Sequence, residues 1–113
     1  SGRFPFWLAP LQVVIATITS EADTYAKEVK ARLTINNIRC KLDCRNEKIN
    51  YKIREHSHAK VPIILVIGER EAKENKVAIR RLGGRDQEIL ELTRAIDTLK
   101  MESLIPGQRS HGV

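Results

Sequence analysis

Five consecutive aliphatic residues, Ile-Ile-Leu-Val-Ile at positions 63–67, are the feature that most constrains the fold of this chain. A strand with one solvated face alternates apolar and polar side chains, and this run does not alternate. We therefore expect a strand that is buried on both faces, as is typical of a parallel sheet covered by helices. Residues 12–18 are also β-rich and almost wholly apolar, and they predict a second buried strand.

Predicted strands and helices alternate along the chain. The predicted strands are residues 12–18, 38–42, 63–67 and 77–82. The predicted helices begin after the capping pattern of Ser20 and Asp23, lie within residues 45–60, and begin again near Asp86. Asn36 and Asn37 are expected to end the first helix, because asparagine tolerates the left-handed conformation found there. The polar residues 68–76 are expected to form a loop.

This order of elements predicts a small three-layer α/β domain. Right-handed crossovers make the first three strands parallel with helices covering them, and a late hairpin adds an antiparallel strand. The length of 113 residues is that of one domain, and a composition of 42% hydrophobic and 30% charged residues excludes a chain disordered as a whole. The longest uncharged apolar stretch, residues 61–68, is far shorter than the ~20 residues that span a bilayer.

Signals for catalysis or metal binding are weak. Thr19-Ser20-Glu21 occupies the place where a glycine-rich phosphate loop would follow the first strand. The two cysteines, Cys40 and Cys44, exclude a disulfide framework and a four-cysteine zinc site, and without a secretory signal the cytoplasm is the expected compartment. His56 and His58 have no cysteine or carboxylate cluster near them in the sequence, so we expect no metal site and no catalytic residues.

Positive charge is concentrated in the middle of the chain. The net charge is +6, and residues 39–85 contain thirteen Lys or Arg against six Asp or Glu, whereas the two flanks together contain seven against eight. A fold that gathers this segment on one face would present a basic surface to a polyanion such as nucleic acid. Charge alone leaves open the alternative of a solvated surface without a partner.

Glu71 and Arg80 would face each other if residues 68–82 formed a hairpin that turned at Asn75 and Lys76. Opposed Cβ atoms would then be about 5 Å apart. One interpretation is a cross-strand ion pair worth about 0.2–1 kcal/mol. The other is a guanine reader, since a carboxylate can accept from the guanine N1–H and N2–H while a guanidinium donates to O6 and N7. Spacing alone favours the ion pair.

Four separated motifs resemble the threonyl-tRNA synthetase family. Residues 4–13 (Phe-Pro-Phe-Trp-Leu-Ala-Pro-Leu-Gln-Val) are similar to the segment that joins the catalytic and C-terminal domains of that family. The central signature of the family resembles three runs: Arg-Asn-Glu-Lys-Ile at 45–49, Lys-Ile-Arg-Glu-His at 52–56 and Val-Pro at 61–62. Lys-Val-Ala-Ile-Arg at 76–80 resembles its late strand, and the resemblance extends over residues 2–101.

The resemblance implies an anticodon-binding domain with a mixed sheet of about five strands and three helices. In this family the domain reads the middle G and the third-position U of the threonine anticodon. Carried over motif by motif, Glu71 and Arg80 fall on the guanine-reading pair, Asn46 on a base contact and Arg54 on an anticodon-loop contact. The resemblance thus reverses the preference for an ion pair. Lys48 and Lys52 are added from their charge alone, as possible phosphate contacts.

The resemblance also implies a larger ligase that attaches threonine to its tRNA with ATP. In the family the catalytic, editing, ATP and zinc sites lie upstream, so we expect these 113 residues to be non-catalytic and to hold none of the parent cofactors ATP, Mg and Zn. We expect a linker at residues 1–10, the anticodon-binding domain at 11–104 and a flexible tail at 105–113. The parent enzyme is expected to be a homodimer, and the isolated domain a monomer.

A rival interpretation is an anticodon-like fold that serves as a protein-interaction or regulatory module without RNA binding. The joint presence of Glu71, Arg80 and Asn46 argues against it, because a docking module needs no guanine reader.

Overall fold

The computed structural model describes residues 5–84 and 86–104, and it is built on one five-stranded mixed sheet. The strands are β1 (Val13–Thr17), β2 (Cys40–Asp43), β3 (Ile63–Ile67), β4 (Lys76–Arg81) and β5 (Gln87–Glu91), in the spatial order β2-β1-β3-β4-β5. β1 is parallel to β2 and β3, whereas β4 is antiparallel to β3 and β5. The predicted mixed sheet of about five strands is confirmed.

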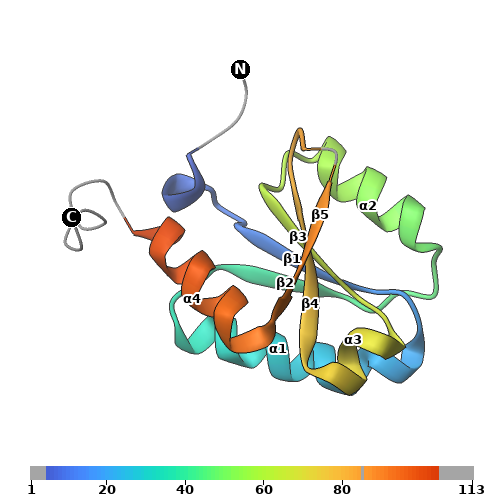
Figure 1. The fold of residues 1–113 in the computed structure, drawn as a ribbon. Helices are drawn as coiled ribbons and strands as arrows, with labels where there is room; N and C mark the ends of the chain where they lie inside the picture. The colour runs from blue at the N-terminus through green and yellow to red at the C-terminus, as the bar shows by residue number, and fades with distance from the viewer. Residues whose placement is uncertain (1–4, 85, 105–113) are drawn as a thin grey trace.

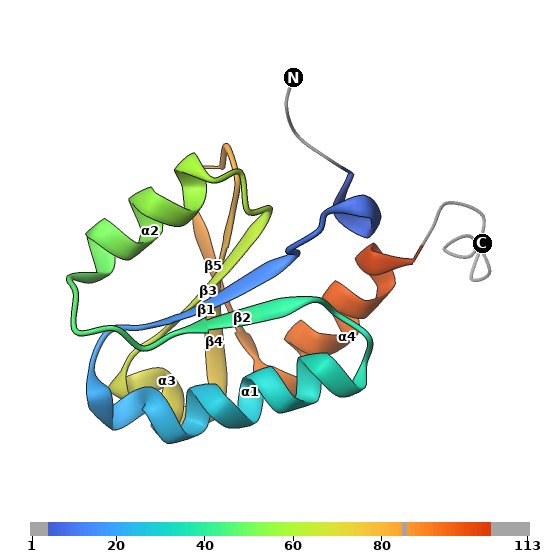
Figure 2. The same ribbon diagram turned by 180° about the vertical axis from the view of Figure 1, so that it is seen from behind.

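Helices cover both faces of the sheet and make three layers. α1 (Asp23–Ile35) and α4 (Leu92–Ser103) lie against one face, and α2 (Ile49–His58) lies against the other (Figures 1 and 2). The short α3 (Glu69–Glu74) follows β3 and packs through Ala72 against the α1 side. Two 3₁₀ turns, η1 (Phe6–Leu8) and η2 (Ser20–Ala22), precede β1 and α1. The three-layer prediction is confirmed, but the part of the chain that the structure describes has four α-helices instead of three.

The alternation of side chains along each strand divides the core in two. Ile63, Leu65 and Ile67 of β3 enter the larger cluster with the apolar stripes of α1 and α4. Ile64 and Val66 enter a smaller cluster, against which Ile49 and Ile53 of α2 pack. All five residues of β3 are buried, as the absence of alternation predicted. Full burial of one such side chain stabilises the fold by about 1.5–3 kcal/mol.

The prediction of a loop at residues 68–76 was wrong, because α3 lies there. Its sequence, Glu-Arg-Glu-Ala-Lys-Glu, consists of strong helix formers. Two ion pairs at i,i+4 spacing join Glu69 to Lys73 at 2.9 Å and Arg70 to Glu74 at 3.4 Å. The helix ends at Asn75, which is left-handed with φ 55° and ψ 46°. Helix propensity and charge spacing therefore outweigh the polar composition that suggested a loop.

The last helix begins at Leu92 and not near Asp86, so that prediction was also wrong. Residues 87–91 instead form the edge strand β5, which pairs with β4 from Gln87 to Glu91. Ile89 is 55% exposed on this strand. Pairing with β4 overrides the local helical pattern, and the buried stripe of α4 starts with Leu92.

The helix end predicted at Asn36 and Asn37 is confirmed. α1 ends at Ile35, and Asn37 has φ 61°, in the left-handed region. The described residues contain no helix that is long and apolar enough to cross a bilayer. The tail predicted at residues 105–113 and the first four residues of the predicted linker lie outside the described residues.

Candidate nucleic-acid interface

The outer strands β4 and β5 have an open face on the α2 side of the sheet. Ile53 of α2 packs against a cluster that extends no further than Ala78 of β4. Ala78 is paired with Ile89 of β5, whose exposed side chain points to the same side. By strand alternation Arg80 also lies on this face, opposite Gln87. The open face therefore presents the long cationic side chain of Arg80 on the same side as the exposed apolar side chain of Ile89.

Arg80 is half-buried, and its guanidinium makes no hydrogen bond or ion pair with any residue that the structure describes. The neighbouring Arg81 points to the other face and forms a two-pronged pair with Glu102, with N–O distances of 2.7 and 2.8 Å. Two adjacent arginines thus differ completely in their partners. The five donors of the Arg80 guanidinium are available to a ligand on the open face.

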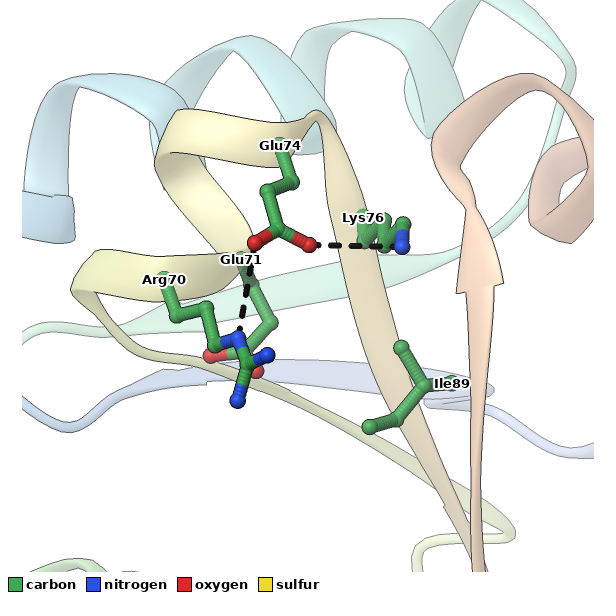
Figure 3. A pocket seen from close by; sticks show the side chains of 5 residues that line it. All are labelled: Arg70, Glu71, Glu74, Lys76 and Ile89. Carbon is green, nitrogen blue, oxygen red and sulfur yellow. Dashed lines mark hydrogen bonds and ion pairs between the residues drawn. The ribbon is translucent and has the colours of Figure 1, made fainter.

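Glu71 lies at the end of the same face, in the first turn of α3. Gly68 N–H donates to Glu71 Oε1 at 2.8 Å, which fixes one carboxylate oxygen. The other oxygen, Oε2, accepts no hydrogen bond from the described residues. A hollow of about 180 Å³ is lined by Arg70, Glu71, Glu74, Lys76 and Ile89 (Figure 3).

The other charges of this hollow are already paired. Arg70 and Lys76 both bind Glu74, with N–O distances of 3.4 and 3.3 Å. Figure 3 shows Glu71 beside this network and outside it. The second oxygen of Glu71 is therefore an acceptor at the rim of the open face.

The predicted opposition of Glu71 and Arg80 was wrong, because α3 replaces the hairpin. Arg80 is instead paired in register with Ile64 of β3, four residues before Gly68. Four residues of strand correspond to about 13 Å. The two side chains thus approach the open face from separate positions and form no ion pair with each other. This excludes the cross-strand ion pair of Glu71 and Arg80 that their spacing in the sequence suggested.

The carboxyl ends of β1 and β3 form a topological switch point. In the order β2-β1-β3, the chain passes from β1 to its neighbour β2 through α1 on one face of the sheet. It then returns past β1 to β3 through α2 on the other face, so the direction of the connections reverses between β1 and β3. Ile18 N–H, just after β1, donates to the carbonyl of Ile67 at 2.9 Å, and Gly68 and Glu71 follow directly. Open α/β sheets bind ligands in the crevice at such a point. Glu71 therefore occupies a position that the topology itself favours for a ligand.

Asn46 lies in a second hollow, of about 330 Å³, beyond the ends of β1 and β2. The Asn46 side chain is exposed and makes no hydrogen bond with any described residue. Thr19 Oγ1, from the same wall, is buried without a partner among the described residues. Burial and Asp23 raise the pKa of the Cys44 thiol, which keeps it neutral. The hollow is lined by Thr17, Ile18, Thr19, Ser20, Cys44, Arg45, Asn46, Glu47 and Lys52.

The cations of the α2 region differ in accessibility. Lys48 and Arg54 are exposed, Lys48 immediately before the helix and Arg54 on its outer surface. Lys52 is only 1% exposed, and its Nζ donates to the carbonyls of Thr17 at 2.8 Å and Asp43 at 3.2 Å. The structure therefore places Lys52 inside the fold, where it joins strand ends, and not on a surface that a phosphate could reach.

His56 has a carboxylate partner that its sequence neighbours did not reveal. His56 Nε2 lies 2.6 Å from Asp43 Oδ2, and Asp43, Glu55 and His56 form a group of potential metal ligands. The Asp43 oxygens, however, also accept hydrogen bonds from Arg45 at 2.9 and 2.8 Å. Because a guanidinium already neutralises these carboxylates, the group does not fit a metal ion.

Gly68 has no room for a side chain beside Glu71. A Cβ atom there would lie 2.9 Å from Glu71 Oε1 and 3.1 Å from Ile18 Cδ1. We expect Gly68→Ala to displace the carboxylate and to lower the free energy of unfolding by about 1–2 kcal/mol. In a Glu71→Ala background the same change should cost less, because the closer of the two contacts is gone and only the one with Ile18 remains. Urea unfolding of the four proteins tests this, and equal costs in both backgrounds would contradict it.

The described residues form an α/β module whose open face presents the hydrogen-bonding side chains of Arg80 and Glu71, an arrangement suited to ligand recognition. A family model described as "Anticodon binding domain" matches residues 12–102. The chain belongs to this family.

Similar proteins agree with this assignment. The chain is 60% identical over 110 residues to the threonine–tRNA ligase of Rhodospirillum rubrum and 62% identical over 109 residues to that of Mesorhizobium japonicum, covering 97% and 96% of the chain. The RNA binding domain of threonyl-tRNA synthetase from Cryptosporidium parvum Iowa II matches with a TM-score of 0.83 and 35% identity, over 87% of this chain and 25% of that one. The predicted resemblance to threonyl-tRNA synthetases is confirmed.

The shared fold extends further than the sequence similarity. Prolyl-tRNA synthetase from Cryptosporidium parvum matches with a TM-score of 0.75 over 97% of this chain and 25% of that one, at only 18% identity. Both ligases named above are much longer, and the chain spans 17% of the length of each. Most of the sequence of each ligase therefore has no counterpart in these 113 residues.

Proposed function

We propose that this domain binds the anticodon loop of threonine tRNA across the open β4–β5 face and the adjoining carboxyl ends of β1–β3. The observation that carries the proposal is the separation of Glu71 and Arg80. Neither the Arg80 guanidinium nor Glu71 Oε2 has a hydrogen-bond partner among the described residues, and the two side chains approach one face from separate positions. Side chains of this length leave room for a planar base between them.

Guanine is the base that suits these two side chains. Its N1–H and N2–H donate to a carboxylate, and its O6 and N7 accept from a guanidinium. Gly68 already occupies Glu71 Oε1, so Oε2 is the oxygen that faces a ligand without a competing bond. We assign the middle G of the anticodon to this pair. The exposed apolar side chain of Ile89 offers a surface for the face of the base.

The hollow around Asn46 suits the third-position U. An amide can donate to a uracil carbonyl and accept from uracil N3–H, and the buried Thr19 hydroxyl supplies a further polar group in the wall. Lys48, just before α2, and Arg54, on the outer surface of α2, are exposed and are assigned to the phosphate backbone of the loop. Lys52 is left out of this assignment because its ammonium group is buried.

The domain would serve a larger ligase that joins threonine to its tRNA with ATP. In this proposal residues 11–104 recognise the anticodon, residues 1–10 connect to the catalytic part, and residues 105–113 form a tail. The ATP, Mg and Zn sites belong to the rest of the enzyme, which we place in the cytoplasm as a homodimer. The contribution of these 113 residues is to select the tRNA.

The rival function is a protein-docking module that has kept the fold and lost RNA binding. It differs from our proposal in a measurable way, because phosphate contacts release counterions and docking to a neutral protein surface does not. Binding of a threonine anticodon stem-loop therefore separates the two.

We expect affinity for a threonine anticodon stem-loop to fall steeply as salt rises. Lys48→Ala should weaken binding of all stem-loops about equally and reduce the slope of log K against log salt by about 0.7–0.9, the effect of one lost phosphate contact. The control is Lys27→Ala, which removes the same charge from the exposed surface of α1 on the other side of the sheet. An NMR titration of the 113-residue chain at several salt concentrations measures this.

Two results would count against the proposal. One is the absence of binding at low salt, which favours the docking module. The other is an equal effect of Lys27→Ala and Lys48→Ala, which would mean that net charge alone, and no particular face, attracts the RNA.

A further inference from the structure

The Asp43 carboxylate is the centre of a buried network at the end of β2. The residue is 3% exposed. Its Oδ1 accepts from Arg45 Nε at 2.9 Å and from Arg45 N at 3.3 Å, and its Oδ2 accepts from Arg45 Nη2 at 2.8 Å and lies 2.6 Å from His56 Nε2. His56 belongs to α2, so this carboxylate ties the strand end and the following loop to the helix.

The Arg45 guanidinium is held on three sides. Asp43 binds it through two parallel hydrogen bonds, and Glu55 of α2 accepts a further one from Nη2. The ring of Tyr51, also on α2, lies 5.9 Å from the Arg45 Cζ atom. A planar fork with these partners has one orientation, which a lysine ammonium could not reproduce.

The loop around Asn46 is therefore anchored at both ends. Asp43 and Arg45 fix the residues before it, and Glu47 N–H donates to the Arg45 carbonyl at 2.8 Å. α2 begins at Ile49, and the buried Lys52 joins that helix to the carbonyls of Asp43 and Thr17. Between these anchors, the side chains of Asn46 and Glu47 line the hollow of about 330 Å³ and make no hydrogen bond with a described residue, and of the two only the Asn46 amide can both donate and accept. Rigid support around a free amide is what precise recognition of a base requires.

We propose that Asp43, Arg45 and His56 are positioning residues that hold Asn46 for reading the third anticodon base. This inference rests on the proposed function of Asn46 and adds the residues through which its geometry is set. The network acts without touching the RNA. The charge of Arg45 is paired with Asp43 and Glu55, so we do not assign Arg45 to a phosphate.

Arg45→Lys separates positioning from charge. The substitution keeps one positive charge and loses the fork, so the loop should loosen while the electrostatic attraction to RNA is kept. We expect the preference for a stem-loop with U at the third anticodon position over one with C to fall about three- to tenfold. The salt slope should not change. Arg32→Lys on α1, which alters an exposed pair with Glu28, is the matched control and should leave the preference unchanged.

The decisive experiment is a cycle with Asn46→Ala, using NMR titrations of the 113-residue chain with the U and C stem-loops. If Arg45 acts through Asn46, Arg45→Lys should have no further effect on the U/C preference once Asn46 is alanine. Asp43→Asn, which keeps the shape of the side chain, provides a second variant with the same expectation. The amide spectrum of each variant is recorded first, so that only folded proteins enter the comparison.

The outcomes separate this inference from the proposed function. No binding of either stem-loop by the unmodified chain would overturn the proposed function. Binding with a U/C preference that falls in Asn46→Ala but is unchanged in both Arg45→Lys and Asp43→Asn would overturn the inference alone. A flatter salt slope in Arg45→Lys, or an undiminished effect in the Asn46→Ala background, would show that Arg45 contacts RNA directly and would likewise overturn it.

Discussion

Replacing Asp43 by alanine is expected to lower the free energy of unfolding at neutral pH by about 3 kcal/mol. The substitution leaves the buried His56 ring nitrogen without its carboxylate partner and removes the acceptor that holds the half-exposed Arg45 guanidinium, and a buried polar group left unpaired costs more than its hydrogen bond contributed. Urea unfolding monitored by circular dichroism measures the change. Glu28→Ala is the control, because it removes a carboxylate from an exposed pair with Arg32 on α1 and should cost no more than about 1 kcal/mol.

The cost of Asp43→Ala should also depend on pH. Burial disfavours the charge on Asp43, but hydrogen bonds from Arg45 and His56 outweigh it and hold the pKa of this carboxyl well below its usual range. A lowered pKa in the folded state gives stability that is fully present above the ordinary aspartate pKa of about 4 and is lost as the pH falls below it. The difference between the two proteins should therefore shrink from pH 5 downward. Parallel stability curves would contradict this role of Asp43.

The sheet was the most predictable part of the fold. An unbroken aliphatic run reports burial on both faces directly, and β3 spans the residues that the run predicted. α3 and β5 were missed for opposite reasons. α3 is favoured by ion pairs at i,i+4 spacing, which were overlooked because the segment is polar throughout. β5 forms because it pairs with β4, although its local sequence has a helical pattern.

The candidate site was predictable only as separate residues. Motif resemblance proposes Asn46, Glu71 and Arg80 as site residues, but the geometry that relates them depends on α3 and on the register of β4. The network of Asp43 and His56 joins residues thirteen positions apart on a strand and a helix, and such a contact leaves no periodic signal. Lys52 illustrates the same limit, since a charged residue type gives no indication that this ammonium is buried between carbonyls.

Arg80→Ala and Glu71→Gln are each expected to weaken binding of the threonine anticodon stem-loop by about 1–3 kcal/mol. Glutamine keeps an oxygen for Gly68 N–H but cannot accept both guanine donors, so it tests recognition with little disturbance of α3. With adenine at the middle position the losses should be much smaller, because adenine lacks N2 and has a donor where guanine has O6. Arg81→Ala, which removes the same charge from the opposite face, is the control.

The central claim is that Glu71 and Arg80 read two different edges of one guanine, and atom-level cycles test it most directly. Stem-loops carrying inosine or 7-deazaguanine at the middle position lack the N2 amino group or N7, respectively. Isothermal titration at low salt should show that Glu71→Gln costs less with inosine than with guanine, and that Arg80→Ala costs less with 7-deazaguanine. Glu71→Gln should cost as much with 7-deazaguanine as with guanine, and Arg80→Ala as much with inosine as with guanine. If both substitutions weaken all three stem-loops equally, the guanine is read elsewhere and this account of the site is wrong.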